Sequence, residues 1–410
     1  MMESPPLAWT TEDRFMLQLL FTPEEARPFL TSGRPDVLSS GAAALDGQRL
    51  FDTARREGVA ALLFRNVRKH RLQDLLPEPI HRGFSDAYHI NLKRNMAIIG
   101  KLRPVLSEFR NKGISCIVLK GIALAERVYP DIAVRGMSDV DLLIRKDDLL
   151  EADRLLLSLG YDSCDSSAAE ALRNPVGYLA SVEYRGAKSP FHLHMHWHPI
   201  NTSVPATLIA ERIDLDRLWD HAVEACVADG SVLILRPEHL VIYLCEHALR
   251  VGHSFDRLIL ICDLFFSIKA FEKVIDWDFI VEESRRFNLS RFVWHGLSVV
   301  RRYAPLELPD GFLSQVRPTD LSLGERLFLH LQSRNRRVRG SSYLLHLAIN
   351  RGFWAKTTFL FRTFFPPKRI MLQRRYLKDV EFSKMMYLSR IGEVLSHLWR
   401  GMTTGRPGVG

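Results

Sequence analysis

The chain has 410 residues and a formal net charge of +9, and 47% of its residues are hydrophobic and 25% charged. This is ordinary globular usage, over a length that suits two or three domains. No run approaches the ~20 apolar residues of a membrane helix, which excludes a protein anchored by a spanning segment. The acidic N-terminal residues do not fit a secretory signal, and five scattered cysteines are typical of a reducing compartment. The sequence therefore predicts a cytoplasmic protein.

Residues 1–110 are predicted to form an N-terminal helical region. Apolar residues recur with helical spacing through residues 42–57, 59–69 and 80–109. The chain should therefore enter the next region from a long amphipathic helix.

Residues 111–205 are predicted to form an α/β core. A helix from Asp147 to Leu159 is expected to pack on its sheet, and residues 165–174 are interpreted as a polar connection. The expected strands are Ile114–Leu119, Val140–Arg145, Gly177–Tyr184 and Phe191–His198.

Helical periodicity returns after Leu208 and predicts a second helical region over residues 206–325. Residues 326–410 are predicted to form a basic helical C-terminal region. The helices expected in the first of these two regions are Leu240–Val251, Asp256–Lys269, Trp277–Phe287 and Ser290–Tyr303.

Two carboxylates open the second predicted strand of the core. Asp139 and Asp141 are two residues apart, so in an extended chain both side chains emerge on one face, while Val140 and Leu142 point to the other. Neighbouring carboxylates repel each other, and a divalent cation would relieve that repulsion. Mg²⁺ suits them because it takes hard oxygen ligands and nucleotide phosphates.

The segment before this strand has features of a phosphate site. Gly121 allows a tight turn between the first strand and a short helix at residues 122–128, whose first N–H groups would face an anion. Lys120 and Arg135 would add positive charge there. An Asp-x-Asp pair by itself is also found in metal-dependent glycosyltransferases and at soluble strand ends, so both alternatives stay open at this point.

The ordered spacing of these motifs resembles the uncharacterised bacterial nucleotidyltransferase family of the polymerase-β-like superfamily. The resemblance rests first on Leu119-Lys120-Gly121, Tyr129-Pro130, Arg135 and the run from Ser138 to Ile144. It spans roughly residues 50–310, about two thirds of the chain. Further matching pieces follow the expected order: Arg94-Asn95, His196-Trp197, Leu218-Trp219, Leu235 to Leu240, Cys245 to Ala248, Cys262 to Leu264 and Asp276-Trp277.

The resemblance implies a small mixed-sheet nucleotidyltransferase core with flanking helical regions. It also implies transfer of a nucleoside monophosphate from a nucleoside triphosphate, with ATP as the expected nucleotide. The acceptor would be a hydroxyl or similar nucleophile on a small molecule, peptide or protein. Asp139 and Asp141 would be catalytic and hold Mg²⁺ or Mn²⁺, and the nucleotide-binding residues would be Lys120, Gly121, Arg135 and Ser138.

The chain departs from the family on the last predicted core strand. The family normally reads Asp-x-His-Trp there, and that acid is the superfamily's third carboxylate, whereas this chain has His194 in its place. Alternation should put His192, His194, His196 and His198 on one face of the strand, and we expect it to be the active-site face. His196 is accordingly an expected cleft residue.

Three interpretations of His194 compete. The imidazole could ligate the metal or deprotonate the acceptor. The substitution could instead mark a catalytically silent module that binds a nucleotide or a partner. The histidines could also be a half-exposed strand face without a ligand. A zinc site made from these histidines alone is not expected, because neighbours on one strand face lie ~6–7 Å apart.

Two residues of the second helical region match family positions. In superfamily enzymes a helical domain after the core closes over the acceptor, so the resemblance implies that His247 and Asp263 are cleft residues. The alternative is that each is hydrogen-bonded inside a helical core.

Residues 331–410 carry the positive charge of the chain. They hold 16 Lys or Arg against three acids, a net of +13, so residues 1–330 sum to −4. Basic and aromatic residues alternate between Arg351 and Arg369, which is typical of a helix lying on an anionic membrane surface or binding an acidic partner. No recognition motif for nucleic acid accompanies the charge. The other interpretation is a helical cap whose arginines are solvated.

Overall fold

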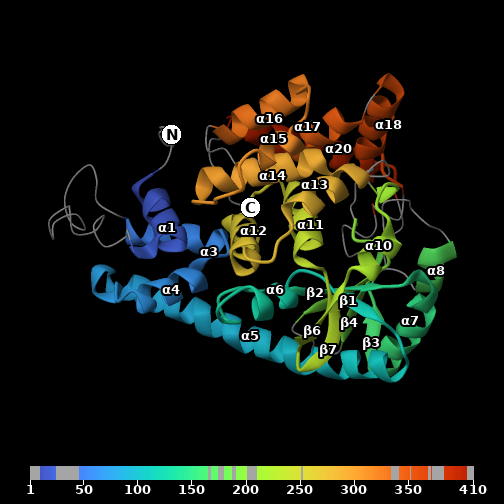
Figure 1. The fold of residues 1–410 in the computed structure, drawn as a ribbon, viewed down its shortest axis with the longest axis horizontal. Coiled ribbons are helices and arrows are strands. Elements are labelled where there is room, and N and C mark those ends of the chain that lie inside the picture. The colour runs from blue at the N-terminus through green and yellow to red at the C-terminus, as the bar shows by residue number, and fades with distance from the viewer. Residues whose placement is uncertain are drawn as a thin grey trace.

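The strands predicted for the core lie together in one sheet (Figure 1). Among the residues described by the computed structural model, the strands form a seven-stranded mixed sheet with helices around it, which confirms the predicted fold class. The described residues are 10–24, 46–164, 168–173, 180–186, 191–200, 210–250, 253–333, 341–350, 352–367, 371 and 383–403.

The sheet has the strand order β3-β4-β5-β2-β1-β7-β6. The pairs β2–β5 and β1–β7 are parallel, and the other neighbours are antiparallel. The central strands β2 and β1 therefore have partners on both sides. The strands are β1 (Cys116–Val118), β2 (Asp139–Ile144), β3 (Tyr161–Ser163), β4 (Ser181–Gly186), β5 (His192–His196), β6 (Val223–Val227) and β7 (Gly230–Ile234).

All four expected core strands are present as β1, β2, β4 and β5, although the first residues expected for β4 lie outside the described ones. The expectation of a polar connection over residues 165–174 is wrong where the structure describes it. Residues 168–173 form helix α8, because Ala168 and Ala171, three residues apart, are both fully buried against the core. The short strand β3 is not predicted by the alternation pattern.

The expectation of helix throughout the chain after Leu208 is also wrong. Residues 223–234 form the hairpin β6–β7, which extends the sheet beyond β1. Its two-residue turn, Ala228-Asp229, has φ of 50° and 59°, the left-handed conformation that suits a tight hairpin. The two strands pair with each other across a very short turn. Sequence reasoning missed them because the segments on either side, α10 (Leu215–Asp220) and α11 (Pro237–Leu249), have helical periodicity.

Helices account for most of the rest of the described chain. In the N-terminal region and the core they are α1 (Thr11–Phe21), α3 (Gly47–Arg56), α4 (Ala60–Lys69), α5 (Glu78–Asn111), α6 (Ile122–Arg127), α7 (Leu149–Ser158) and α8 (Ala168–Arg173), with short 3₁₀ turns at Gln73–Leu75 and Lys146–Asp148. After the core they are α10 (Leu215–Asp220), α11 (Pro237–Leu249), α12 (Leu258–Phe271), α13 (Trp277–Arg286), α14 (Ser290–Tyr303), α15 (Phe312–Val316), α16 (Leu323–Ser333), α17 (Ser342–Ile349), α18 (Phe353–Phe364) and α20 (Met385–Thr403).

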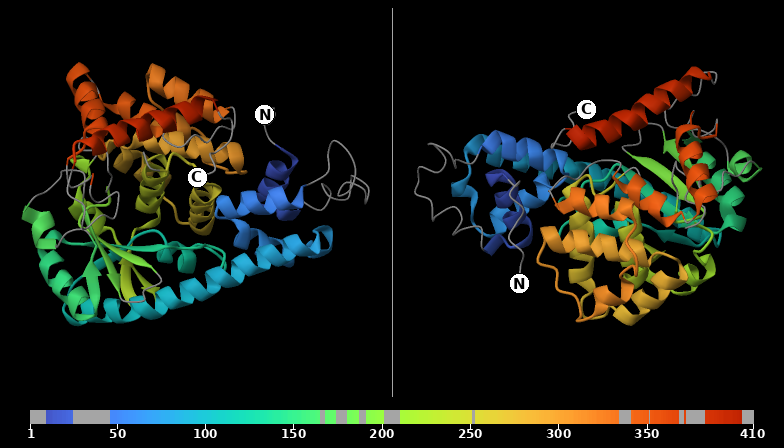
Figure 2. Two further views of the ribbon diagram at one scale, coloured as in Figure 1. Left: turned by 180° about the vertical axis from the view of Figure 1, so that it is seen from behind. Right: turned by 90° about the horizontal axis from the view of Figure 1, so that it is seen from above.

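The two faces of the sheet have different neighbours. One face packs Val140, Leu142, Leu193 and Met195 against α5, α7 and α8 in a continuous apolar cluster. The other face looks toward α11 and α12, and Figure 2 shows the sheet from behind, between the long α5 and these helices. Residues such as Leu143 join the second cluster on that side. The sheet is therefore the middle layer of the molecule.

The N-terminal helices and the helices after the core share one apolar cluster. The ring centroids of Phe21 and Phe265 are 4.9 Å apart, and the carboxylate of Glu57 accepts a hydrogen bond from the N–H of Leu258 at 2.8 Å. The division of the chain at residues 110, 205 and 325 stays a prediction. In the described part of the chain, no helix has the length and apolar character needed to cross a membrane.

Candidate active site

The carboxylates and imidazoles expected at the site lie on one face of the sheet. Strands β2 and β5 pair in parallel with Asp139 opposite His192 and Asp141 opposite His194. Paired residues project to the same side of a sheet, so these side chains and His196 share the face opposite the α5 core. The prediction of one imidazole face is confirmed for the three histidines of β5.

The fourth histidine of the series lies elsewhere. His198 follows the end of β5, its Nδ1 accepts from the N–H of Ile200 at 3.0 Å, and its Nε2 lies 3.1 Å from the carbonyl of Ala210. Burial lowers its pKa to about 4, so the ring is neutral. The expectation that His198 joins the other imidazoles is wrong because the extended strand stops two residues earlier.

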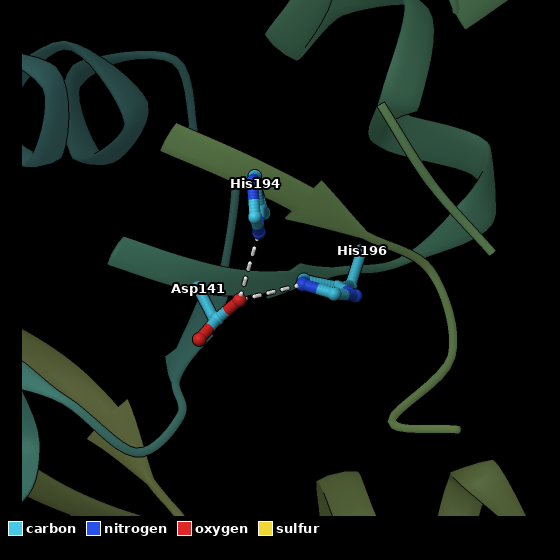
Figure 3. A group of neighbouring side chains, drawn as sticks. All are labelled: Asp141, His194 and His196. Atoms are coloured by element: carbon cyan, nitrogen blue, oxygen red, sulfur yellow. Dashed lines mark hydrogen bonds and ion pairs between the residues drawn. The ribbon is translucent and has the colours of Figure 1, made fainter. Parts of the chain in front are cut away.

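Asp141 is the centre of the site. Its Oδ1 lies 2.9 Å from Nε2 of His196 and 3.3 Å from Nδ1 of His194, and Figure 3 shows both rings directed at this one oxygen. The ligand atoms of these three residues all lie within 4.8 Å of one another. The residue is only 4% exposed. A buried carboxylate therefore has two potential metal ligands beside it.

Lys120 joins the two carboxylates of the pair. Its Nζ lies 3.1 Å from Oδ2 of Asp141 and 3.8 Å from Oδ2 of Asp139. Burial alone would lower the pKa of Lys120, but the charges of Asp141 and Asp139 outweigh it and raise the pKa above its usual value. The ammonium is thus a fixed cation between two carboxylates.

The same contacts determine the charge states of the neighbouring groups. Burial opposes ionisation of Asp141, yet Lys120 and the two imidazoles hold its pKa well below the usual range. Burial also opposes the charged form of His194, but Asp141 and other nearby carboxylates raise its pKa, whereas burial keeps the pKa of His196 low. Among the described residues, Nδ1 of His196 is buried without a hydrogen-bond partner. Neutral His196 can therefore donate from Nε2 to Asp141 and keep Nδ1 as an acceptor.

The turn beside this cation needs glycine. Gly121, between β1 and α6, has φ 60° and ψ −107°, a backbone conformation that residues with a side chain rarely adopt. The predicted strand, turn and short helix are therefore present. Ser138, at the other side of the pair, is exposed and its hydroxyl donates to Oδ1 of Asp139 at 3.4 Å.

Arg135 and Asp263, predicted separately, contact each other. Nη2 of Arg135 lies 2.9 Å from Oδ2 of Asp263, Nε lies 3.3 Å from Oδ1, and the hydroxyl of Tyr129 donates to Oδ1 at 2.8 Å. Asn95 of α5 holds the same loop by donating to the carbonyl of Arg135 at 2.9 Å. The loop before β2 is thus attached to α12 and α5, and the role of Arg135 at phosphates stays a prediction.

His247 is buried on α11, and its ring centroid is 4.4 Å from that of His253. Burial and the nearby charge of Lys120 hold its pKa well below the usual value. The structure therefore places His247 as a neutral group within electrostatic reach of the site. Its role in the cleft stays a prediction.

The comparison with known families agrees with this geometry. A family model described as uncharacterised nucleotidyltransferase matches residues 43–305, well over half of the chain. The chain belongs to this family. No curated protein matches it. Membership confirms the resemblance found in the sequence and supports nucleotidyl transfer as the general class of function. The matched range contains the whole described sheet and α11–α14, and it ends before the basic C-terminal region.

Sequence reasoning missed two residues beside the candidate site. Glu183 of β4 lies opposite His194 in the sheet, with Oε2 3.8 Å from its Nε2. The signal was present, because Ser181 and Glu183 alternate with Val182 and Tyr184 in a predicted strand. Tyr243 of α11 is also close enough to be affected by the charges of Lys120 and Asp141, and burial raises its pKa to about 12. No sequence pattern distinguished Tyr243 from the other residues of this helix.

Proposed function

We propose that this nucleotidyltransferase moves a nucleoside monophosphate from a nucleoside triphosphate to a hydroxyl or similar nucleophile on a small molecule, peptide or protein. ATP is the nucleotide we expect. The observation that carries the proposal is the pair Asp139 and Asp141 sharing one cation, Lys120, on the polar face of β2. That arrangement lies within the region matched by the family.

The donor set fits a divalent cation. Asp139 and Asp141 would hold Mg²⁺ or Mn²⁺, and the ammonium of Lys120 already stands beside both carboxylates as a positive charge. His194 or His196 could add nitrogen ligands, which Mn²⁺ accepts more readily than Mg²⁺. When bound, the metal would offset charge on the phosphates and on the leaving pyrophosphate.

The residues of the chain would bind and orient the reactants. Lys120, displaced from the carboxylates, would donate to a phosphate oxygen beside the Gly121 turn, with Ser138 and Arg135 at the same end of β2. His194 lies between Asp141 and Glu183, and the negative charges around it raise its pKa. A raised pKa makes the neutral imidazole a stronger base toward the proton of the acceptor hydroxyl.

A catalytically silent nucleotide-binding module is the second candidate. The observation that favours it is that Lys120, His194 and His196 all contact Asp141, and that His194 occupies the place of the family's third acid. Such a site could bind a nucleotide without turning it over.

Calorimetry followed by a pyrophosphate assay separates the two functions. The protein would be titrated with ATP in Mg²⁺ or Mn²⁺, then incubated with small-molecule, peptide and protein acceptor pools. Binding with pyrophosphate release supports the transferase. Binding without release from any pool supports the silent module, and no metal-dependent binding of any nucleoside triphosphate contradicts both.

We further propose that the C-terminal helices contact an anionic membrane surface. Helix α18 exposes Phe353, Trp354 and Phe361 at 73%, 80% and 62%, and Trp354 and Phe361 are seven residues apart, on one side of the helix. Lys356 and Arg362 of the same helix are exposed. Aromatic residues beside cationic ones suit a helix lying on anionic lipid.

Vesicle sedimentation tests this location. The full chain should bind vesicles that contain phosphatidylserine more strongly than neutral vesicles, and less strongly at high salt. Trp354→Ser combined with Phe361→Ser should weaken the binding, whereas Leu323→Ser, at a residue 83% exposed on α16, is the control and should not. Equal sedimentation with both vesicle types contradicts the proposal.

A further inference from the structure

A second group of metal-ligating side chains lies near the outer edge of the sheet. It consists of Cys164, Glu183 and His192, a thiol, a carboxylate and an imidazole. Their ligand atoms all lie within 4.8 Å of one another. The group shares no residue with Asp139, Asp141, His194 or His196.

The pairing of the strands brings these residues together from three parts of the chain. Cys164 directly follows β3, and its N–H donates to the carbonyl of Glu183 in β4 at 2.8 Å. Glu183 in turn lies opposite His194 in β5, so His192 is its diagonal neighbour, and Nδ1 of His192 is hydrogen-bonded to Oε1 of Glu183. The continued β3–β4 register places Cys164 opposite Glu183, so its sulfur lies beside the hydrogen-bonded acid and imidazole.

We propose that Cys164, Glu183 and His192 bind Zn²⁺ or a similar borderline divalent cation. Thiolate, imidazole and carboxylate are the three protein ligands of zinc, whereas a thiolate is a poor ligand for Mg²⁺ or Ca²⁺. In a tetrahedral zinc site with bonds of ~2.0–2.3 Å, the ligand atoms stand about 3.3–3.8 Å apart. The sulfur, within 4.8 Å of the other two ligand atoms, therefore needs to move closer by only about 1 Å, while the hydrogen-bonded Glu183 and His192 would move apart to admit the ion.

The three residues are accessible enough for an ion to enter. Glu183 is buried, at 9% exposure, while Cys164 and His192 are partly exposed. None of the described cysteines is in a disulfide. Binding displaces the thiol proton of Cys164, so the affinity for the metal rises with pH. Three protein ligands leave the fourth position to water.

An ion here would connect the edge of the sheet with the candidate active site. It would tie the end of β3 to β4 and β5, and it would fix Glu183, whose Oε2 lies 3.8 Å from Nε2 of His194. The imidazole of His194 would then be oriented from one side by Asp141 and from the other by a metal-bound carboxylate. The proposal itself does not depend on nucleotidyl transfer.

Cobalt titration tests the site in the full-length protein. Metal-depleted protein would be titrated with Co²⁺, because a sulfur ligand produces a thiolate-to-cobalt charge-transfer band in the near ultraviolet. We expect the band to saturate at one equivalent, to disappear when Zn²⁺ is added, and to be present in Asp141→Asn. The last result separates this site from the nucleotide site.

Three variants show whether the sulfur is Cys164. Cys164→Ser should abolish the band, and His192→Gln should weaken Co²⁺ binding by at least ~10–100-fold, the loss caused by removing even an outer partner of a metal ligand. Cys226→Ser is the matched control, since Cys226 is an exposed cysteine on β6, and it should keep the band. Circular dichroism checks that each variant is folded. Absence of a band from the wild-type protein, or its persistence in Cys164→Ser, overturns the proposal.

Discussion

The two faces of the central sheet are built from the same strands and have different tasks. On β2 and β5, Val140, Leu142, Leu193 and Met195 point into an apolar layer against α5 and α7. Asp139, Asp141, His194 and His196 alternate with these apolar residues. Their carboxylates and imidazoles point to the other face, toward α11 and α12. The difference shows that alternation of period two lets one strand pair supply both the core and the candidate site. Substitutions on the two faces should therefore affect different properties.

The largest expected effect is a loss of activity on substitution of the polar face of β2 and β5. Asp141→Asn removes a proposed metal ligand and should lower nucleotidyl transfer by ~10²–10³-fold or more, the scale of losing one strong electrostatic contact to a transition state. Pyrophosphate release measures it.

Asp162→Asn is the control for this substitution, because Asp162 is an exposed carboxylate on β3 of the same sheet. It should leave the activity unchanged. Turnover by Asp141→Asn equal to that of the wild type would remove the proposed role of the polar face.

Substitutions on the apolar face should lower the stability of the protein. Leu193 is fully buried, and Leu193→Ala should lower the free energy of unfolding by about 2–5 kcal/mol through lost burial and a cavity. Denaturant unfolding measures the change. The folded Leu193→Ala protein should bind ATP with the affinity of the wild type. A large loss of affinity without a loss of stability would contradict the assignment of stability to the apolar face and binding to the polar face.

A smaller loss of stability is expected from weakening the contact between Asp263 of α12 and the loop before β2. Asp263→Asn keeps the shape of the carboxylate but removes its charge, so the bonds from Arg135 and Tyr129 weaken. We expect a loss of about 1–3 kcal/mol in stability, as for other hydrogen bonds to charged groups. Thermal unfolding measures it.

Asp278→Asn, at an exposed residue in the first turn of α13, is the control for the α12 contact. If both variants lose the same stability, Asp263 has no special part in holding the loop before β2.

The last effect should lie far from both faces and depend on pH. Burial opposes ionisation of Glu325, but His295, Ser322 and Arg291 lower its pKa to about 2. A lowered pKa means that the ionised carboxylate stabilises the fold above its unfolded pKa of about 4.3, and that this contribution is lost as the pH falls toward 2. Glu325→Gln should be less stable than the wild type at pH 7, and the difference in unfolding free energy should shrink in acid. If the difference in unfolding free energy between Glu325→Gln and the wild type stays the same at all pH values, the proposed stabilisation by the ionised carboxylate is contradicted.

Much of this arrangement could be predicted because it is local. The alternation in residues 140–145 and 191–198, with the Asp pair that opens the first of them, predicts both strands and the shared face of Asp139, Asp141, His194 and His196, and the register confirms that they lie together. Gly121 marks the turn for the same reason, since its positive φ is a property of a single residue.

What could not be predicted depends on contacts between distant residues. Arg135 and Asp263 are 128 positions apart, and each has a plausible role alone, so only the folded chain shows that they pair. The position of Lys120 between the carboxylates likewise follows from the packing of β1 beside β2. The hairpin β6–β7 was missed because its Ala-Asp-Gly turn is brief within a helical context.

The most direct test is a crystal structure of the protein with Mn²⁺ and a non-hydrolysable ATP analogue, using the anomalous signal of manganese. The account predicts a peak bonded to oxygens of both Asp139 and Asp141, with Lys120 moved from between them to a phosphate. A bound nucleotide with no metal on these carboxylates, and Lys120 still joining them, would contradict it.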